Sequence, residues 1–249
     1  MSHRFPDHFS GQAAAYARAR PTYPEGLFTW LEELAGAVRV WDCACGSGQA
    51  SAALARRFPE VIATDASEQQ VANAARTDGV HYAAGLAEEA PVASGSIGLT
   101  TVAQALHWLR RDAFYAEVRR VSGPDAWFVA WTYGHVTVDP VSDVPLTELY
   151  ATTLGPYWPF ERRFVDARYA TLEFPFDAIP TPSLDMHCEW QRDELIDYVA
   201  TWSAVAAMQR ATGEDPLPAL RARLAETWPD GERRTVRWPL AIRAGRVRR

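Results

Sequence analysis

The sequence predicts an α/β fold, a doubly wound and mostly parallel sheet of seven strands. Three observations predict it. Short strand-like segments alternate with helical segments from residue 38 to residue 133. A glycine-containing turn joins the first of these strands to a helix, as in ligand-binding βαβ units. Beyond residue 133 the alternation stops, and residues 139–182 contain seven prolines. We therefore expect an insertion that packs over the C-terminal edge of the sheet.

Two helices are predicted ahead of the first strand. The first covers residues 9–20 and is ended by the prolines of Arg20-Pro21-Thr22-Tyr23-Pro24. The second covers residues 25–34, because Pro24 stands near its first turn and its apolar residues recur on one face. We expect residues 1–36 to form an N-terminal helical lid.

The first βαβ unit is the clearest element of the sequence. Residues 38–42 are rich in strand formers and end in Asp42. Gly46 and Gly48 follow in a tight turn, and residues 49–57 favour a helix. Residues 61–65 form the second strand and end in Asp65, 23 residues after Asp42. This unit predicts a ligand site where the two strands end.

The remaining elements follow from periodicity and turn signals. Ser67 caps the next helix, with Gln70 in the capping-box position. We expect further strands at 80–84, 97–103, 126–133, 184–190 and 234–243, and further helices at 112–121, 192–210 and 218–227. The whole chain is expected to be a single domain, with a lid (1–36), a cofactor-binding core (37–138), a substrate-side insertion (139–182) and C-terminal helices with closing strands (183–249).

Composition excludes several classes of function. The net charge of −6 argues against a nucleic-acid partner, which favours a basic face. The sequence contains no lysine, so a lysine Schiff base is excluded. The use of arginine for all 25 basic residues also indicates the codon bias of a GC-rich genome, and we therefore expect a bacterial source. Three cysteines are too few for a structural zinc site, and we expect no metal. Apolar runs are too short to span a bilayer and no signal segment is present, so we expect a cytoplasmic protein without membrane contact.

The acid that ends the second strand predicts a nucleoside-containing cofactor. A carboxylate at Asp65 suits the two hydroxyls of a ribose. A dinucleotide such as NAD would require a third glycine where this chain has Ser51, and Asp42 would repel its pyrophosphate. Asp42 would instead suit a cationic ligand, such as the amino group of a methionine moiety.

The D-x-A-x-G-x-G pattern at Asp42–Gly48 resembles motif I of class I S-adenosylmethionine-dependent methyltransferases. That family has glycine where this chain has Ala44, a change that we expect to be tolerated through a negative φ. Beyond this motif, the chain resembles the methyltransferase type-11 group, near its trans-aconitate methyltransferase-like branch. The matching segments are 9–24, 85–88, 104–108, 114–121 with the Gly-Pro turn that follows, 201–203 and 238–240.

The resemblance implies a cofactor and a set of site residues. The cofactor is S-adenosyl-L-methionine, with S-adenosyl-L-homocysteine as the product. The expected cofactor-binding residues are Tyr16, Arg20, Asp42, Ala44, Gly46, Gly48, Asp65, Ala66, Gln70, Leu86, Ala87, Glu88, Ala103 and Gln104. The expected catalytic residues are His107, Gln104 and Trp108, with His107 as the candidate base. The aromatic residues expected to line a pocket are Trp108, Trp131, Tyr133, Tyr157, Trp158 and Trp202.

The expected reaction is methyl transfer to a small-molecule acceptor, favouring a carboxylate or hydroxyl oxygen. For a carboxylate, Arg20, Arg162 or Arg163 could supply the binding fork. Three alternatives stay open: an RNA or protein substrate, an S-adenosylmethionine-binding protein that regulates or catalyses another reaction, and an NAD-dependent dehydrogenase. The expected assembly is a monomer or a homodimer.

Overall fold

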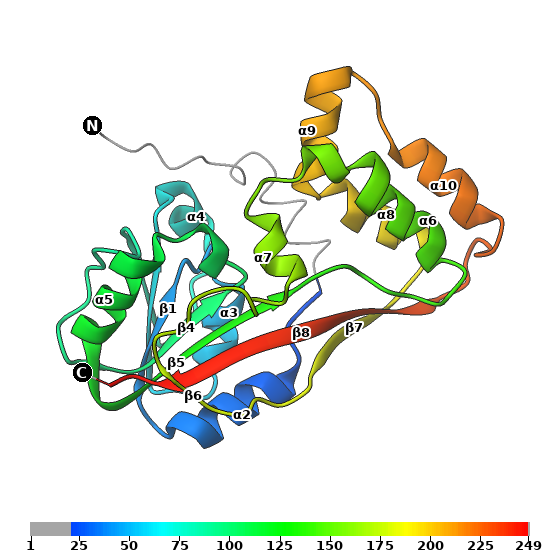
Figure 1. The fold of residues 1–249 in the computed structure, drawn as a ribbon. Helices are drawn as coiled ribbons and strands as arrows, with labels where there is room; N and C mark the ends of the chain where they lie inside the picture. Colours follow the sequence, from blue (N-terminus) through cyan, green and yellow to red (C-terminus); the bar gives the residue numbers. More distant parts are fainter. Residues whose placement is uncertain (1–20, 249) are drawn as a thin grey trace.

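The computed structural model describes residues 21–248. The helix expected over residues 9–20 lies outside this range, and so do two of the expected cofactor-binding residues, Tyr16 and Arg20. Figure 1 shows a twisted sheet flanked by helices, with a separate group of helices beyond one end of the sheet.

The sheet confirms the predicted α/β architecture. Its strand order is β3-β2-β1-β4-β5-β8-β6, and β7 pairs with β8 outside this path. The first five strands run parallel to their neighbours, and β8 runs antiparallel to β5. The bounds of the strands are β1 Arg39–Cys43, β2 Glu60–Asp65, β3 Val80–Ala84, β4 Ile97–Ala103, β5 Ser122–Tyr133, β6 Asp177–Ala178, β7 Asp185–Trp190 and β8 Arg234–Arg246. The seven expected strands are present, and β6 is an additional short strand.

The strand β8 serves two sets of neighbours. Its second half, residues 240–246, pairs with β5, and its first half, residues 234–239, pairs with β7. It therefore extends from the sheet toward the separate group of helices, as the red arrow in Figure 1 shows.

Two apolar cores lie on opposite faces of the sheet. Neighbouring residues of β1 alternate between them, with Val40 in one core and Trp41 in the other. The helices α2 (Glu25–Ala35) and α3 (Gln49–Leu54) contribute to the first core, and α5 (Arg111–Val121) contributes to the second. Leu27 and Leu31 of α2 are fully buried, so this part of the expected lid packs in the core.

The remaining helices follow the predicted positions, except that α3 ends three residues earlier than expected. The helix α4 (Glu68–Asn73) has no buried residue. Residues 192–210 form two helices, α8 (Arg192–Ala200) and α9 (Ser203–Thr212), followed by α10 (Leu217–Ala225). The insertion contains α6 (Asp143–Glu148) and α7 (Arg162–Asp166). In Figure 1, α7 lies between the C-terminal edge of the sheet and the group of α6, α8, α9 and α10.

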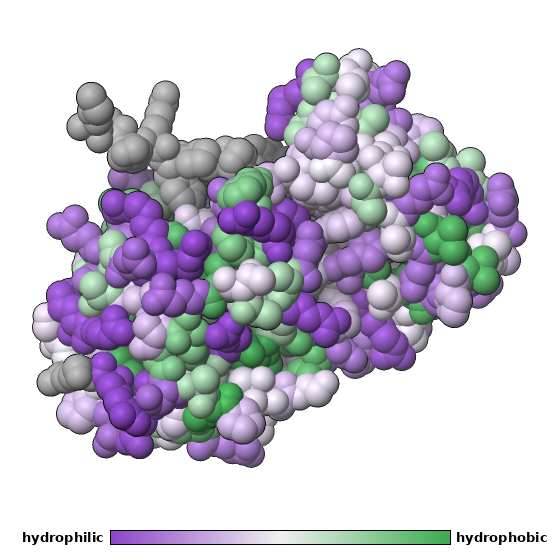
Figure 2. Space-filling model, in the orientation of Figure 1, coloured by the Kyte–Doolittle hydropathy of each residue, from purple (hydrophilic) through white to green (hydrophobic). Residues whose placement is uncertain are grey.

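The surface is mixed in polarity. On the face drawn in Figure 2, hydrophilic residues predominate and hydrophobic ones form small separate groups. Within residues 21–248, no helix has the length and apolar character needed to cross a membrane.

Candidate active site

The turn after β1 adopts an unusual backbone conformation. Ala44 and Gly46 both have φ of 56°, and Gly48, which caps α3, has φ of 84°. The negative φ expected at Ala44 is therefore wrong. The left-handed region costs an L-residue about 1–2 kcal/mol because its Cβ crowds the following carbonyl. The turn imposes on alanine a conformation that glycine adopts freely, and such strain is often found at functional sites.

Asp42 lies beneath this turn and is fully buried. Its two carboxylate oxygens accept hydrogen bonds from the hydroxyls of Ser51, at 2.6 Å, and Thr101, at 3.0 Å. Burial raises the pKa of Asp42 to about 6, and the two hydrogen bonds oppose this shift. Asp42 thus connects β1 to α3 and β4 through hydrogen bonds. Ser51, at the position where a dinucleotide-binding fold has glycine, donates one of these bonds. A contact between Asp42 and a ligand stays a prediction.

Asp65 joins the ends of β1 and β2. One carboxylate oxygen accepts the Gly46 N–H at 2.8 Å, and the other accepts the Ser67 N–H at 2.9 Å. A carboxylate offers about four lone-pair sites, so it can accept several donors at once. Among residues 21–248, no atom lies within 4 Å of a Cβ built on Gly46. The described residues therefore leave the backbone of the turn open beside a half-buried carboxylate.

The segment after β3 supplies an apolar border to the same edge. Leu86 is 46% exposed, unusually so for a leucine, and Ala87 beside it is buried. Glu88 turns away, because its carboxylate accepts the Arg110 N–H at 3.0 Å and pairs with the Arg110 guanidinium. Leu86 thus offers an apolar contact near Asp65, whereas the Glu88 side chain serves to anchor the start of α5.

The other expected cofactor residues are on the same edge. Ala66 is exposed directly after β2, and the Gln70 N–H donates to the Ser67 hydroxyl, which caps α4. Tyr82 of β3 lies against Gly48, where an added Cβ would approach the Tyr82 hydroxyl oxygen to 2.2 Å. Gly48 therefore has a steric reason to be glycine in addition to its positive φ.

Gln104 follows β4 and has a second strained non-glycine backbone, with φ of 56°. Its side-chain amide donates to the carbonyl of Tyr133 at 2.9 Å and accepts the Tyr133 N–H at 2.9 Å. The Thr132 hydroxyl also donates to it. These bonds hold the half-buried end of β4, Ala103 and Gln104, against the end of β5. The Gln104 side chain therefore holds the end of β5 in place, and contact between Gln104 and a ligand stays a prediction.

His107 lies in the short 3-10 helix η2 (Leu106–Trp108) and is buried. Its Nδ1 is 2.8 Å from the hydroxyl of Tyr169, a partner that sequence reasoning missed. Burial, with the nearby Arg162 and Arg111 cations, lowers the pKa of His107 to about 3. An imidazole with so low a pKa is a poor general base at neutral pH. The geometry favours a positioning role, in which His107 holds the insertion against the end of β4.

The aromatic residues that were expected to line a pocket lie in three different surroundings. Trp131 is fully buried in the core, so its placement in a pocket is wrong. The ring of Trp108 lies against His107, with ring centres 4.8 Å apart. Trp158 and Trp202 pack together with Tyr150 in the insertion and the helical group, with ring centres 4.8–5.7 Å apart.

Two of the arginines expected to bind a carboxylate, Arg162 and Arg163, have different surroundings. Arg162 lies over the rings of Trp158, at 4.8 Å, and Tyr150, at 5.3 Å. Arg163 is exposed and lies over Phe160, which is itself 66% exposed. Of these two, Arg162 is the less exposed, and its contact with an acceptor stays a prediction.

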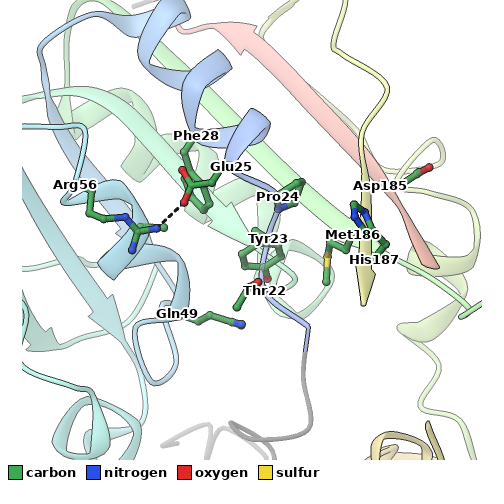
Figure 3. A pocket seen from close by; sticks show the side chains of 11 residues that line it. Thr22, Tyr23, Pro24, Glu25, Phe28, Gln49, Arg56, Asp185, Met186 and His187 are labelled. Atoms are coloured by element: carbon green, nitrogen blue, oxygen red, sulfur yellow. Dashed lines mark hydrogen bonds and ion pairs between the residues drawn. The ribbon is translucent and has the colours of Figure 1, made fainter. Parts of the chain in front are cut away.

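A pocket of about 330 Å³ opens beside the N-terminal end of α2, between Tyr23, Gln49 and the start of β7 (Figure 3). Two of its charged residues, Glu25 and Arg56, pair with each other at 2.9 Å. None of the described residues expected to be catalytic or cofactor-binding lines it. The Gln49 side chain donates to the Pro21 carbonyl at 3.2 Å, so residue 21 is held at the start of α3, next to the glycine turn.

Comparison with known proteins assigns the chain to a family. Residues 41–130 match the model of a methyltransferase domain. A Dictyostelium discoideum protein named as a methyltransferase is 30% identical over 240 residues, which cover 94% of this chain and 91% of that protein. An uncharacterized methyltransferase of Mycobacterium tuberculosis is 36% identical over 118 residues, 47% of this chain and 48% of that protein.

Solved structures agree with the sequence relatives. A structure from Anaeromyxobacter dehalogenans, described as a type II methyltransferase, has a TM-score of 0.86 and 45% identity, and the match covers 91% of this chain and 97% of that one. An Anabaena variabilis structure has a TM-score of 0.55 at 16% identity, covering 90% and 99%, which shows the shared fold alone.

Proposed function

The chain belongs to the class I S-adenosylmethionine-dependent methyltransferases, and from this premise we propose that it transfers a methyl group from S-adenosylmethionine to the oxygen of a small acidic molecule. The observation that carries the proposal is the hydrogen bond from the Gly46 N–H to the Asp65 carboxylate. It places a carboxylate that can take ribose hydroxyls beside a glycine backbone that faces open space.

The described residues fit an adenosyl ligand. Asp65 would take the ribose hydroxyls, Leu86 would lie against the adenine, and the Gly46 backbone would face the methionine part. Bound there, the cofactor supplies an electrophilic methyl group on a sulfonium. The protein's main task is then to align the acceptor and to exclude water.

A carboxylate is the acceptor that fits the described residues best. A carboxylate oxygen is already deprotonated at neutral pH, so its methylation needs no general base, and His107 is a poor one. Arg162 can hold such an acceptor through a charge-assisted bond. The net charge of −6 supports a small molecule over a nucleic acid. We place the chain near the trans-aconitate methyltransferase-like branch on the segments that resemble it, and we propose action in the cytoplasm as a monomer or homodimer.

Calorimetric titration with S-adenosylmethionine, S-adenosylhomocysteine and NAD tests the cofactor directly. We expect micromolar binding of both adenosyl ligands and no binding of NAD. Production of S-adenosylhomocysteine with a panel of small carboxylic acids then tests transfer. Binding of NAD alone would overturn the proposal. Binding of the adenosyl ligands without turnover of any carboxylate, alcohol, amine or thiol would favour a regulatory protein.

A further inference from the structure

His135 lies two residues beyond the end of β5 and lacks hydrogen-bond partners. Both ring nitrogens are shielded from solvent, and neither has a partner within residues 21–248. Burial, with the Arg162 cation, lowers the pKa of His135 to about 4, so the ring is neutral at pH 7 and keeps one N–H donor and one acceptor. Since buried polar atoms nearly always have a partner, this imidazole suits a partner that residues 21–248 do not supply, such as a ligand.

Aromatic rings surround this imidazole. The Tyr150 ring centre is 4.7 Å away and that of Trp202 is 6.1 Å away. Trp158 packs on both, and Tyr150 and Trp158 are only half-buried. Such ring faces and edges favour a flat, conjugated body over a saturated one of equal size, because offset and edge-on aromatic contacts add to simple burial.

A cation with unused donors completes the surroundings. The Nε of Arg162 donates to the Tyr150 hydroxyl at 2.7 Å and lies 3.3 Å from the Asp166 carboxylate. Its two Nη groups have no partner among the described residues, and 21% of its side chain is exposed. Stacking over Tyr150 and Trp158 holds the guanidinium in place. Arg162 therefore has donors available for a carboxylate.

Two links bring these groups to the reacting end of the sheet. The Gln104 side chain holds both backbone polar groups of Tyr133, two residues before His135. The bond between His107 and Tyr169 holds the segment after α7 against η2, next to the end of β4. In open α/β sheets, ligands bind outside these carboxyl ends.

We propose that His135 and Arg162 bind the acceptor together, and that the acceptor is a carboxylic acid with an aromatic or conjugated body. Arg162 takes the carboxylate, the rings take the flat body, and His135 hydrogen-bonds to an oxygen of the acceptor. This inference rests on the proposed methyl transfer and adds to it a binding residue and a class of acceptor.

Paired acids of similar size test the acceptor class. We would measure S-adenosylhomocysteine formation with trans-cinnamate and with 3-cyclohexylpropanoate, which differ in flatness and conjugation. The expected result is a kcat/KM at least tenfold higher for cinnamate. Equal use of the two acids, or turnover of amines or thiols but of neither acid, would overturn the inference while leaving methyl transfer in place.

Variants of His135 test the binding residue. His135→Phe keeps a ring and removes both polar atoms, and we expect it to raise KM for cinnamate about tenfold with a smaller change in kcat. His135→Asn, which restores a donor and an acceptor, should recover part of the loss. Arg162→Gln should also raise KM, whereas Arg163→Gln, on the exposed neighbour, should not.

Cofactor affinity distinguishes a failure of acceptor binding by His135 from a failure of the proposed methyl transfer. All four variants should bind S-adenosylmethionine within about twofold of the unmodified protein, and thermal unfolding checks that each is folded. A wild-type KM in His135→Phe would overturn the role of His135. Absence of S-adenosylmethionine binding by the unmodified protein would instead overturn the proposed function.

Discussion

The two halves of the site are built in different ways. The proposed cofactor half lies within residues 42–88, in the turns that follow β1, β2 and β3, and its contacts join neighbouring strand ends, such as Asp65 and Gly46. The proposed acceptor half joins residues that are distant in the chain, such as His107 and Tyr169, which are 62 residues apart. The first half is a property of one βαβ unit, and the second depends on how the insertion folds over the sheet.

The largest effect is expected from a change in the cofactor half. Asp65→Ala removes the acceptor of two backbone N–H groups and the expected partner of the ribose. Hydrogen bonds to charged groups contribute about 1.5–3 kcal/mol, so S-adenosylmethionine should bind about tenfold to a hundredfold more weakly in calorimetry. Asp78→Ala, at an exposed position before β3, is the matched control. Unchanged affinity in Asp65→Ala would remove this residue from the cofactor site.

The acceptor half should respond to acid through His107. The folded protein keeps this ring neutral down to a pKa of about 3, whereas the unfolded chain binds a proton below about pH 6.5. Stability is therefore lost as the pH falls through this window, by about 2 kcal/mol between pH 6.5 and pH 5. Denaturant unfolding of His107→Gln should show a shallower dependence on pH, and the exposed His81→Gln controls for loss of an imidazole. Identical slopes in His107→Gln and the unmodified protein would contradict the assigned burial.

Substitution of the two glycines of the turn should have different effects, on stability at Gly48 and on cofactor affinity at Gly46. Gly48→Ala would bring a Cβ against Tyr82 and would strain a φ of 84°, so we expect a loss of about 1–2 kcal/mol in unfolding free energy. The Cβ added in Gly46→Ala would meet no atom of residues 21–248, and it would enter the space expected for the cofactor. It should therefore weaken S-adenosylmethionine binding more than Gly48→Ala does, after allowance for folding. The reverse order of cofactor affinities would contradict the location of the methionine part.

The smallest effect is expected at Ala44. Ala44→Gly relieves a left-handed alanine but makes the unfolded chain more flexible, so the two effects partly cancel. We expect a gain of up to about 1 kcal/mol in unfolding free energy. A clear loss of stability would show that the positive φ at this residue carries little strain.

The fold was largely predictable because its signals are local. Alternating strands and helices up to Tyr133, the turn between Gly46 and Gly48, and the Ser67 cap are all set by residues near one another in sequence. The length of β8 and its exchange of partners were not predictable, because they depend on where β7 lies. The φ of Ala44 was also mispredicted, since the backbone of the turn prevails over the preference of the side chain.

The site was predictable only in its first half. Asp65, Gly46 and Gly48 follow from one βαβ unit, and the structure joins Asp65 to Gly46 by a hydrogen bond. His135 gave no signal, since its position in the sequence does not reveal that both ring nitrogens are buried without a partner in residues 21–248. The pairing of His107 with Tyr169 was hidden for the same reason, because periodicity does not show contacts across 62 residues.

The path of β8 has a consequence for biosynthesis. Strand β5 ends at Tyr133, but the strand that covers its edge begins only at Arg234, about a hundred residues later. A ribosome adding 5–20 residues per second takes roughly 5–20 s to make that stretch. Throughout this interval the nascent chain carries an unpaired strand edge of apolar character, the kind of surface that recruits other chains. Slow translation through the proline-rich insertion would prolong this exposure, so heterologous production should benefit from added chaperones.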